Sequence, residues 1–187
     1  CPRNLHPYAT SHFAGEQVVL SAGQIGGIQG IVLRLSNAFG VPTNKHVNCW
    51  MLLVNDLCRQ AVQTHKLILH SSGQQQRDFI AMIEVCHVVE RLAEVNNEGA
   101  ATGIFNIGSG ESQSVLAMAN TIQQRCVHVL GFEPDLLRKE NVEDDYFLPF
   151  TYQTDRLGAM GTQLDASKNI AEIDNLLNYC AASFEQS

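Results

Sequence analysis

The chain has 187 residues, of which 45% are hydrophobic and 17% are charged, proportions typical of a folded globular protein rather than a disordered one. Its formal net charge of −7 and its lack of any run of lysine and arginine argue against a nucleic-acid partner. No apolar run approaches the roughly 18 residues that span a membrane, so no membrane partner is expected. The length suits one or two domains.

Cysteine and histidine spacing argues against metal sites and disulfide bonds. The six cysteines form no Cys-x-x-Cys pair, and the seven histidines form no His-Glu-x-x-His cluster. We therefore expect no metal and no disulfide framework, but reduced thiols in the core of a cytoplasmic protein. The cysteines are Cys1, Cys49, Cys58, Cys86, Cys126 and Cys180.

Helical and strand patterns alternate along the chain. Pro7 suits the first turn of a helix, apolar residues follow it, and Gly26-Gly27 is a usual stop. Ile31-Val32-Leu33-Arg34-Leu35 is a short apolar run of the kind found in buried parallel strands. The expected elements, in chain order, are a helix over 7–25, a strand over 31–35, a loop over 36–44, a helix over 49–64, a strand over 66–70, a turn at 71–73, a helix over 83–95, a strand over 104–107 and a helix ending at 130.

Capping residues place the ends of two of these helices. Asn48 is expected to cap the second helix, and Ser112 or Ser114 the fourth, which Gly131 ends. Strands that alternate with helices in this way predict an α/β fold with a parallel sheet. The remaining segments are an acidic stretch over 135–149, expected to be irregular, and two short helices over 154–160 and 167–182.

Tyr8 and His12 lie four residues apart at the start of the first expected helix, so both side chains point from one face. A phenol acts as an acid or base near neutral pH only when something lowers its pKa, and a cation one turn away does that. The alternative is a structural pair, in which an aromatic side chain at a helix start packs on the core and the histidine takes no part in chemistry.

Tyr8-Ala9-Thr10-Ser11-His12 resembles the Tyr-x-x-x-Lys active-site helix of the short-chain dehydrogenase/reductase superfamily. In particular it is similar to the extended branch, the NAD-dependent epimerase/dehydratase family that acts on nucleotide sugars. Three later segments resemble that family in the expected order, and a fourth resembles its closing helices. They are Leu33-Arg34-Leu35-Ser36-Asn37-Ala38-Phe39-Gly40, Arg77-Asp78-Phe79-Ile80, Ile104-Phe105-Asn106-Ile107-Gly108-Ser109-Gly110-Glu111-Ser112 and Tyr152-Gln153-Thr154-Asp155-Arg156-Leu157.

The resemblance implies the C-terminal portion of a Rossmann-like parallel sheet with a smaller α/β substrate-binding region. Residues 1–110 are expected to be the remaining part of the NAD(P)-binding domain, interleaved with substrate-binding segments near 38–76. Residues 111–187 are expected to form the C-terminal substrate-binding region. The chain begins at Cys1-Pro2-Arg3 and contains no Gly-x-x-Gly-x-x-Gly turn, so we expect the C-terminal part of a longer enzyme, inactive in isolation, whose dinucleotide-phosphate site lies upstream.

The family's catalytic pair maps onto the first helix. By resemblance, Tyr8 is the catalytic acid/base beside NAD or NADP, the cofactor that carries the hydride. His12 stands where the family has the lysine that holds the nicotinamide ribose and lowers the pKa of the phenol. A lysine is reliably protonated at pH 7, whereas an imidazole, with an ordinary pKa near ~6.5, is mostly neutral unless something acidic holds its proton. Contact with the ribose and a purely structural role both stay open for His12.

Three further positions border the cofactor or the substrate by resemblance. Phe39 lies in the loop beside the nicotinamide, and Asn37 contacts the phosphates of the nucleotide sugar. Arg77 grips the diphosphate, since a planar guanidinium bonds phosphate oxygens in pairs. The alternatives are a loop asparagine that bonds its own backbone and a surface arginine paired with an acid such as Asp78.

Two other segments carry less functional weight. Asn106-Ile107-Gly108-Ser109-Gly110 follows a strand and precedes a helix, and we interpret it mainly as a structural turn, because a lone Gly-x-Gly is weak support for phosphate binding. Ala81-Met82-Ile83-Glu84 stands where the family usually has His-Val-x-Asp, and so departs from its pattern.

Two functions are compatible with these residues. The first is an NAD(P)-dependent epimerase, dehydratase or reductase of nucleotide sugars, which the joint presence of Tyr8, Asn37 and Arg77 favours. The second is a non-catalytic relative that binds a dinucleotide or a sugar nucleotide as a sensor or scaffold, which His12 and the altered turn after Ile80 favour. By resemblance, the protein is also expected to form a homodimer through the helix over 7–25.

Overall fold

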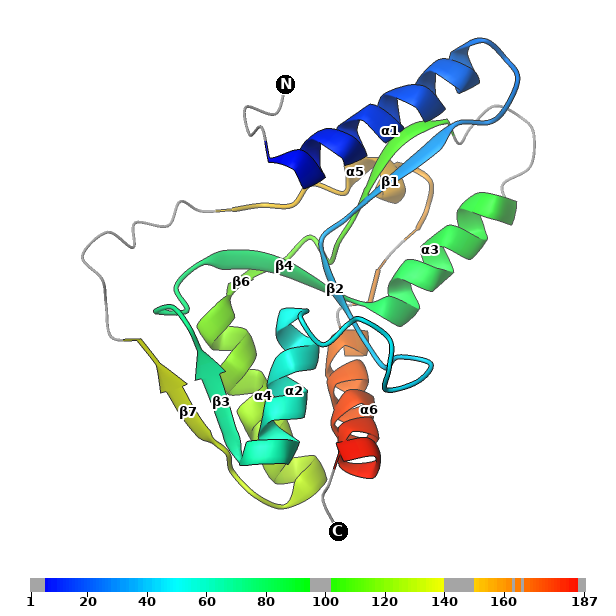
Figure 1. Ribbon diagram of the computed structural model, residues 1–187. Helices are drawn as coiled ribbons and strands as arrows, with labels where there is room; N and C mark the ends of the chain where they lie inside the picture. Colours follow the sequence, from blue (N-terminus) through cyan, green and yellow to red (C-terminus); the bar gives the residue numbers. More distant parts are fainter. Residues whose placement is uncertain (1–5, 95–101, 140–149, 163, 166, 185–187) are drawn as a thin grey trace.

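The computed structural model describes residues 6–94, 102–139, 150–162, 164–165 and 167–184, and Figure 1 shows them in an α/β arrangement. The initial Cys1-Pro2-Arg3 and most of the acidic stretch, residues 140–149, lie outside the described residues. In chain order the elements are α1 (Pro7–Gln24), β1 (Ile31–Leu35), β2 (Asn37–Phe39), α2 (Leu53–Thr64), β3 (Lys66–Leu69), β4 (Gln76–Ala81), α3 (Met82–Glu94), β5 (Gly103–Ile107), β6 (Ser112–Ser114), α4 (Val115–Leu130), β7 (Asp135–Arg138), α5 (Asp155–Ala159) and α6 (Ser167–Phe184).

Parallel strand pairs organise these elements. β1 pairs with β5, from Ile31 opposite Gly103 to Leu35 opposite Ile107. β2 pairs in parallel with β4, and β3 pairs in parallel with β7. The expected α/β fold with parallel strands is confirmed, with one difference: β6 pairs with β4 in the antiparallel sense.

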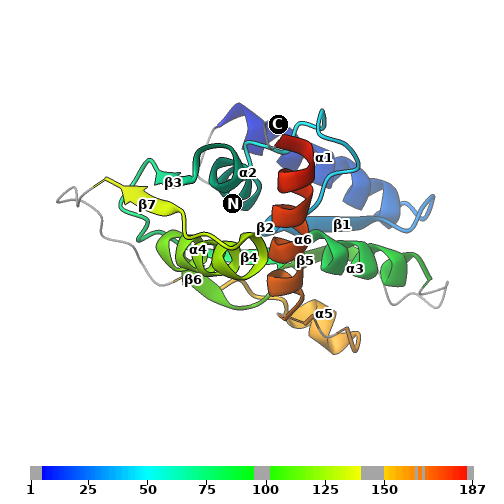
Figure 2. The ribbon, with the colours of Figure 1, turned by 90° about the horizontal axis from the view of Figure 1, so that it is seen from below.

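The buried side chains form two clusters, which β4 links. The larger cluster joins α2, β3, α4 and α6 around side chains such as Leu57. The smaller joins α3, β5 and α5 around Phe105. Successive strand side chains point to opposite faces, and accordingly Phe79 belongs to the larger cluster and Ile80 to the smaller. Figure 2 shows β3, β7, α2 and α4 on one side and α1, β1 and α3 on the other, with α6, which contacts α2, α4 and α3, between them.

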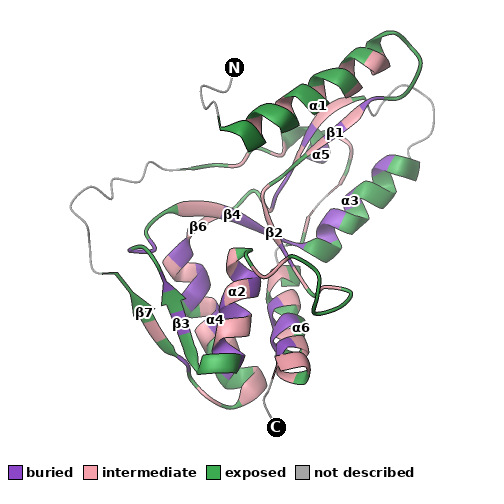
Figure 3. Ribbon diagram, in the orientation of Figure 1, coloured by how far each residue is buried: buried purple, intermediate pink, exposed green. Residues whose placement is uncertain are grey.

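Helix ends and buried faces follow from local sequence in most cases. In α4, the Ser114 hydroxyl accepts a hydrogen bond from the Ala117 amide at 3.0 Å, and Gly131 ends the helix with φ 79°. Both capping predictions for this helix are confirmed, with Ser114 rather than Ser112 as the cap. The helix α1 differs from the others because none of its residues is buried, as its colouring in Figure 3 shows.

Three sequence-based boundaries are wrong. The helix α2 begins at Leu53 rather than at Cys49, and its cap is Leu52 rather than Asn48. The intervening turn is held by Trp50, whose indole N–H donates to the Lys45 carbonyl at 2.9 Å. Short strands β2 and β7 occupy parts of the expected loop over 36–44 and of the expected irregular stretch over 135–149. Pairing with distant strands, rather than local pattern, sets these two elements.

Three thiols are packed in the larger cluster. Cys58, Cys126 and Cys180 are buried and free, while Cys49 is half-buried and Cys86 exposed. Burial raises the pKa of the Cys126 and Cys180 thiols to about 12, so both are neutral core side chains at pH 7. This agrees with the expected reduced core thiols. None of the described helices combines the length and the hydropathy needed to cross a membrane.

Candidate active site

All five residues singled out in the sequence line one cavity of about 670 Å³. Tyr8 and His12 come from α1, Asn37 and Phe39 from β2, and Arg77 from β4. The helix α1 lies along β1 (Figure 1), and β1 leads directly into β2. β2 pairs in parallel with β4, with Asn37 opposite Phe79, so Asn37 and Arg77 lie on neighbouring strands. Three separate segments of the chain therefore line the cavity.

The aromatic pair on α1 is in direct contact. The ring centroids of Tyr8 and His12 lie 4.2 Å apart, with their planes tilted by 40°. The helix begins at Pro7, and the His6 ring nitrogen accepts a hydrogen bond from the Tyr8 amide at 3.3 Å. Tyr8 is 68% exposed, so it is not a core aromatic as the structural alternative required. The phenol is therefore open to a ligand and touches an imidazole one turn away.

An ion pair borders the same cavity and was given no role in the sequence. Glu16 lies one turn after His12, and its carboxylate accepts hydrogen bonds from Arg34 Nε at 2.8 Å and Arg34 Nη2 at 2.6 Å. The hydrogen bond from Arg34 is the largest cause that lowers the pKa of Glu16, and the reverse contact raises the pKa of Arg34. The helical spacing of Tyr8, His12 and Glu16 was the available signal for Glu16. Its partner Arg34 could not be identified from spacing.

Tyr152 supports this ion pair from the other side of β1. Its hydroxyl donates to the Arg34 carbonyl oxygen at 2.9 Å, and burial raises the pKa of the phenol. A half-buried phenol with a raised pKa that already donates to a backbone carbonyl is poorly suited to accept a proton near neutral pH. Tyr152 therefore has a structural role, in contrast to the exposed Tyr8.

Asn37 is anchored to the neighbouring strand rather than to its own loop. Its side-chain amide donates to the Asp78 carbonyl oxygen at 2.8 Å, which the parallel pairing of β2 with β4 makes possible. The alternative of an asparagine that bonds its own backbone is therefore wrong. Asn37 is half-buried and lines the cavity, so it combines an anchoring contact with exposure to a ligand.

Arg77 does not pair with Asp78, in contrast to the expected alternative. Its Nε and Nη2 atoms donate to the Gln75 side-chain oxygen at 3.3 and 2.8 Å. Asp78 is fully buried and points to the opposite face of β4. Because Gln75 is uncharged, this contact does not neutralise Arg77, and among the described residues no acid forms an ion pair with it, which suits an anionic ligand.

The turn after β5 holds a carboxylate of this chain. Asp78 accepts hydrogen bonds from the Ser109 amide at 2.9 Å, the Ser109 hydroxyl at 3.0 Å and the Gly110 amide at 2.7 Å. A Cβ atom on Gly108 would lie 2.7 Å from the Asp78 carboxylate and 2.5 Å from the Tyr152 ring. The structural interpretation of this turn is confirmed, because its amide groups already bind Asp78 and are not free for a phosphate.

An apolar wall completes the cavity, and sequence reasoning missed it. It comprises residues at the start of α2 and its preceding turn, namely Met51, Leu52, Leu53 and Val54. The buried Asn55 fixes this wall to the chain that follows Phe39, since its amide donates to the Gly40 carbonyl at 2.8 Å. Met51 is 78% exposed at the edge of the cavity.

The segment that departs from the family pattern takes its polar contacts from α6 and from Asp165, which precedes that helix. Asn169 accepts a hydrogen bond from the Ala81 amide at 2.7 Å and donates to the Phe79 carbonyl at 2.9 Å. Glu84 is buried and accepts from the Asp165 amide at 3.0 Å. These bonds hold β4 in place and thereby fix the position of Arg77.

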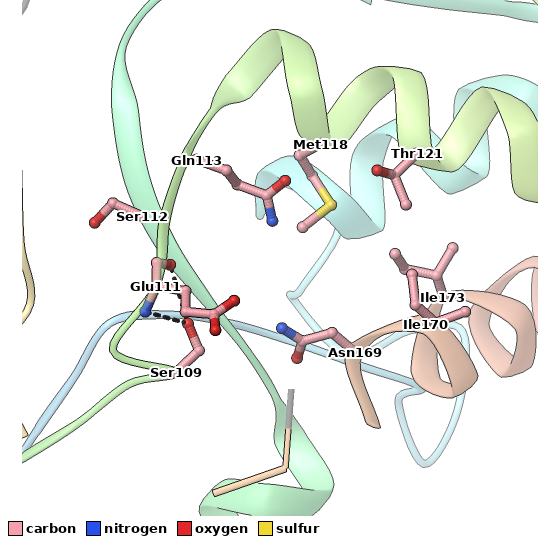
Figure 4. Close-up of a pocket in the computed structure, with 9 residues that line it drawn as sticks. All are labelled: Ser109, Glu111, Ser112, Gln113, Met118, Thr121, Asn169, Ile170 and Ile173. Carbon is pink, nitrogen blue, oxygen red and sulfur yellow. Dashed lines mark hydrogen bonds between the residues drawn. The ribbon is translucent and has the colours of Figure 1, made fainter. Parts of the chain in front are cut away.

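A smaller cavity of about 250 Å³ lies beside β6, between α4 and α6. Figure 4 shows Glu111, Gln113 and Asn169 around it, while Ser112 points away from the other side chains. Ser109 and Glu111 bond each other through a hydroxyl and the backbone at 3.1 Å. None of the five predicted site residues lines this cavity.

Comparisons with known proteins agree with this fold. The model of the NAD dependent epimerase/dehydratase family matches residues 1–108. The dTDP-L-rhamnose 4-epimerase of Burkholderia thailandensis is 29% identical over 121 residues, which cover 65% of this chain and 32% of that protein. The solved UDP-N-acetylglucosamine 4-epimerase of Methanobrevibacter ruminantium, in complex with UDP-N-acetylmuramic acid, has a TM-score of 0.75 at 19% identity, over 95% of this chain and 54% of that one.

A third relative is RMD from Pseudomonas aeruginosa, solved in complex with NADPH. It has a TM-score of 0.74 at 18% identity, over 97% of this chain and 58% of that one. At such identities the likeness shows the fold, which confirms the expected resemblance to Rossmann-like enzymes. The chain spans between 32% and 58% of the length of these three relatives.

Proposed function

This chain belongs to the NAD dependent epimerase/dehydratase family, and we propose that the protein containing it is an NAD(P)-dependent epimerase, dehydratase or reductase of a nucleotide sugar. The observation that carries the proposal is the gathering of Tyr8, His12, Asn37, Phe39 and Arg77 around one cavity of about 670 Å³. Three segments far apart in the sequence supply these side chains, in the order that the family's motifs predict.

Tyr8 is the proposed acid/base. Its exposed phenol is open to a sugar hydroxyl, from which it removes or to which it returns a proton. NAD or NADP, when bound, accepts or donates the hydride at its nicotinamide. His12 suits such a cofactor, because its ring N–H can donate to a ribose hydroxyl. The Phe39 side chain is only 1% exposed and belongs to the larger buried cluster, so it supports the cavity from within the core. The contact between His12 and Tyr8, at 4.2 Å between ring centroids, supports a ligand that meets both side chains.

The substrate phosphates are assigned to the other end of the cavity. Arg77 carries a positive charge that its contact with the uncharged Gln75 does not neutralise, and a guanidinium binds phosphate oxygens in pairs. Asn37 lies beside it on the paired strand and supplies polar atoms near the same region. The apolar wall from Met51 to Val54 would then cover the sugar or the base and exclude water.

The two buried clusters support separate regions for the cofactor and for the substrate. We assign β1, β5, α1 and α3, within residues 1–110, to the cofactor side. The cluster built on α2, β3, α4 and α6 joins residues 38–76 to residues 111–187, and we assign it to the substrate side. Asn37 and Arg77 lie on β2 and β4, which run between these two groups of elements.

We also propose that α1 forms an isologous contact with a second copy. No residue of α1 is buried within the chain, and Val18 is 69% exposed. A helix that packs on its own chain along one side only and carries exposed apolar side chains suits pairing in a two-fold homodimer. Light scattering at high micromolar concentration tests this, since a monomer would contradict it.

A second candidate function is a non-catalytic relative that binds a dinucleotide or a sugar nucleotide. The imidazole of His12 at the position of the family lysine favours it, since a neutral ring supports a phenolate less than an ammonium does. Assays of nucleotide-sugar conversion and of ligand binding, on the full-length protein that contains this chain, separate the two. The enzyme converts its substrate and loses that activity in Tyr8→Phe, whereas the binding protein retains ligand affinity and never turns over.

A further inference from the structure

The outer half of the apolar wall lies before α2 rather than in it. Leu53 and Val54 belong to the first turn of that helix, whereas Met51 and Leu52 precede it. All four line the cavity of about 670 Å³. Met51 is 78% exposed and Leu52 41%, so burial of their own side chains does little to hold them at the cavity. Contacts of the adjacent chain must therefore fix this half of the wall.

The side chain of Trp50, which directly precedes the apolar wall, contacts both α6 and α2. Its ring is stacked on that of Tyr179, with centroids 6.4 Å apart, and meets the Phe184 ring edge-on at 5.0 Å. The guanidinium carbon of Arg59 lies over the Trp50 ring, 5.7 Å from its centroid. Aromatic pairs and cation–π contacts of this geometry are attractive. Trp50 is half-buried and packs against the larger cluster, so it attaches the turn before α2 to the rest of the protein.

Hydrogen bonds anchor the chain on both sides of the wall. Before it, the Trp50 indole N–H donates to the Lys45 carbonyl at 2.9 Å and closes the turn. After it, the buried Asn55 bonds both backbone groups of Gly40: its amide group donates to the carbonyl at 2.8 Å, and its side-chain oxygen accepts from the N–H at 3.3 Å. The wall is therefore held at one end by an aromatic ring and at the other by a buried amide.

We propose that Trp50 is a positioning residue for binding of the nucleotide sugar. It holds Met51 and Leu52 at the cavity before the ligand arrives, so that the ligand does not have to order them as it binds. Trp50 does not itself line the cavity and acts through the wall. The inference rests on the proposed function, which assigns this wall to the substrate and Tyr8 and His12 to the cofactor. Loss of the Trp50 contacts should therefore weaken binding of the substrate and not of NAD.

Hydrogen exchange of the unliganded full-length protein, read by mass spectrometry, tests whether Trp50 holds the wall. The Leu52 amide donates to the Cys49 carbonyl at 3.1 Å, and local opening of the turn exposes it to exchange. The contacts of one aromatic ring correspond to about a 2- to 12-fold change in an equilibrium constant. Trp50→Ala should therefore speed exchange over residues 44–53 by about that factor and leave α4 unchanged, whereas a general loss of stability would speed exchange in both.

Calorimetry on the same proteins tests the effect on binding, with UDP-glucose as the nucleotide-sugar probe and NAD as the cofactor probe. Trp50→Ala should raise the Kd of UDP-glucose by about 2- to 12-fold and leave that of NAD unchanged. Trp50→Phe keeps an aromatic ring beside Phe184 and should restore most of the affinity. The matched control is Phe132→Ala, which removes a half-buried ring that contacts His65 at the far end of α2; it should change neither Kd.

Faster exchange confined to residues 44–53, together with weaker binding of UDP-glucose alone, supports the proposal. Unchanged exchange, an unchanged Kd for UDP-glucose, or an equal loss of affinity for both ligands overturns it. If Trp50→Ala does not fold, Phe184→Leu removes a ring contact from the α6 side and decides by the same criteria. A wild-type protein that binds no UDP-glucose would contradict the proposed function, whereas the exchange measurement needs no ligand and decides separately whether Trp50 holds the wall.

Discussion

The carboxylate of Asp78 accepts two hydrogen bonds from Ser109, one from the backbone amide at 2.9 Å and one from the hydroxyl at 3.0 Å. This contact joins β4 to the turn after β5. On the same strand, the preceding Arg77 points the other way and lines the cavity. The buried acid therefore helps to fix the position of the arginine that lines the cavity.

Replacement of Asp78 by Asn should destabilise the fold. Asn keeps the shape, but its amide group would face N–H donors and leave at least one buried group unpaired, at a cost of about 1 to 3 kcal/mol. Urea denaturation measures the free energy of unfolding. Asp135→Asn changes an exposed carboxylate on β7 and serves as the control. Equal stabilities of the two variants would show that the Asp78 contacts contribute little.

Replacement of Arg77 by Gln should weaken binding of a nucleoside diphosphate such as UDP. Loss of a hydrogen bond from a charged donor costs about 1.5 to 3 kcal/mol, which is roughly a 10- to 150-fold rise in Kd. Isothermal calorimetry on the full-length protein gives the value directly. Arg91→Gln removes an arginine that lines a different cavity and should leave Kd unchanged. Equal affinity of the Arg77 variant and the wild type would place the phosphates elsewhere.

The Glu16–Arg34 pair should make stability depend on acid pH. The pKa of Glu16 is lowered in the folded state, mainly by the Arg34 hydrogen bond, so its contribution is present above the ordinary value of 4.5 and is lost as the pH falls through the lowered pKa. Glu16→Gln should therefore cost about 0.2 to 1 kcal/mol at pH 7 and nothing once the wild-type carboxylate is protonated.

Denaturation curves for wild type and Glu16→Gln at neutral and strongly acidic pH check this sign. Glu133→Gln alters an exposed carboxylate and should show no such dependence. A difference between wild type and Glu16→Gln that grows toward low pH would contradict the account.

Local signals in the sequence were sufficient for much of the fold. Pro7 and Gly26-Gly27 bound α1, and Ser114 and Gly131 bound α4, because caps depend on neighbouring residues only. The strand β2 could not be predicted in this way, because it is three residues long and exists through its pairing with β4. The four-residue spacing of Tyr8 and His12 within one helix was enough to predict that their side chains lie together.

Contacts between distant segments limited what could be predicted of the site. Glu16 and Arg34 are 18 residues apart, and nothing in either segment alone identifies the partner. One alternative paired Arg77 with an acid such as Asp78 at the surface, but alternation along β4 turns Asp78 into the protein. The apolar wall from Met51 to Val54 is likewise set by the packing of α2.

Turnover by the Tyr8→Phe variant tests the central claim most directly. The substitution deletes the phenolic hydroxyl and little contact area, so binding of NAD and of the nucleotide sugar should stay close to that of the wild type. Loss of the proton carrier should lower kcat by a factor of about 100 or more. The experiment compares kcat and Kd of the full-length wild type and Tyr8→Phe proteins on the same nucleotide sugar. A kcat near zero with unchanged Kd is the predicted result, and a Tyr8→Phe protein with full turnover would contradict the assignment of Tyr8 as the acid/base.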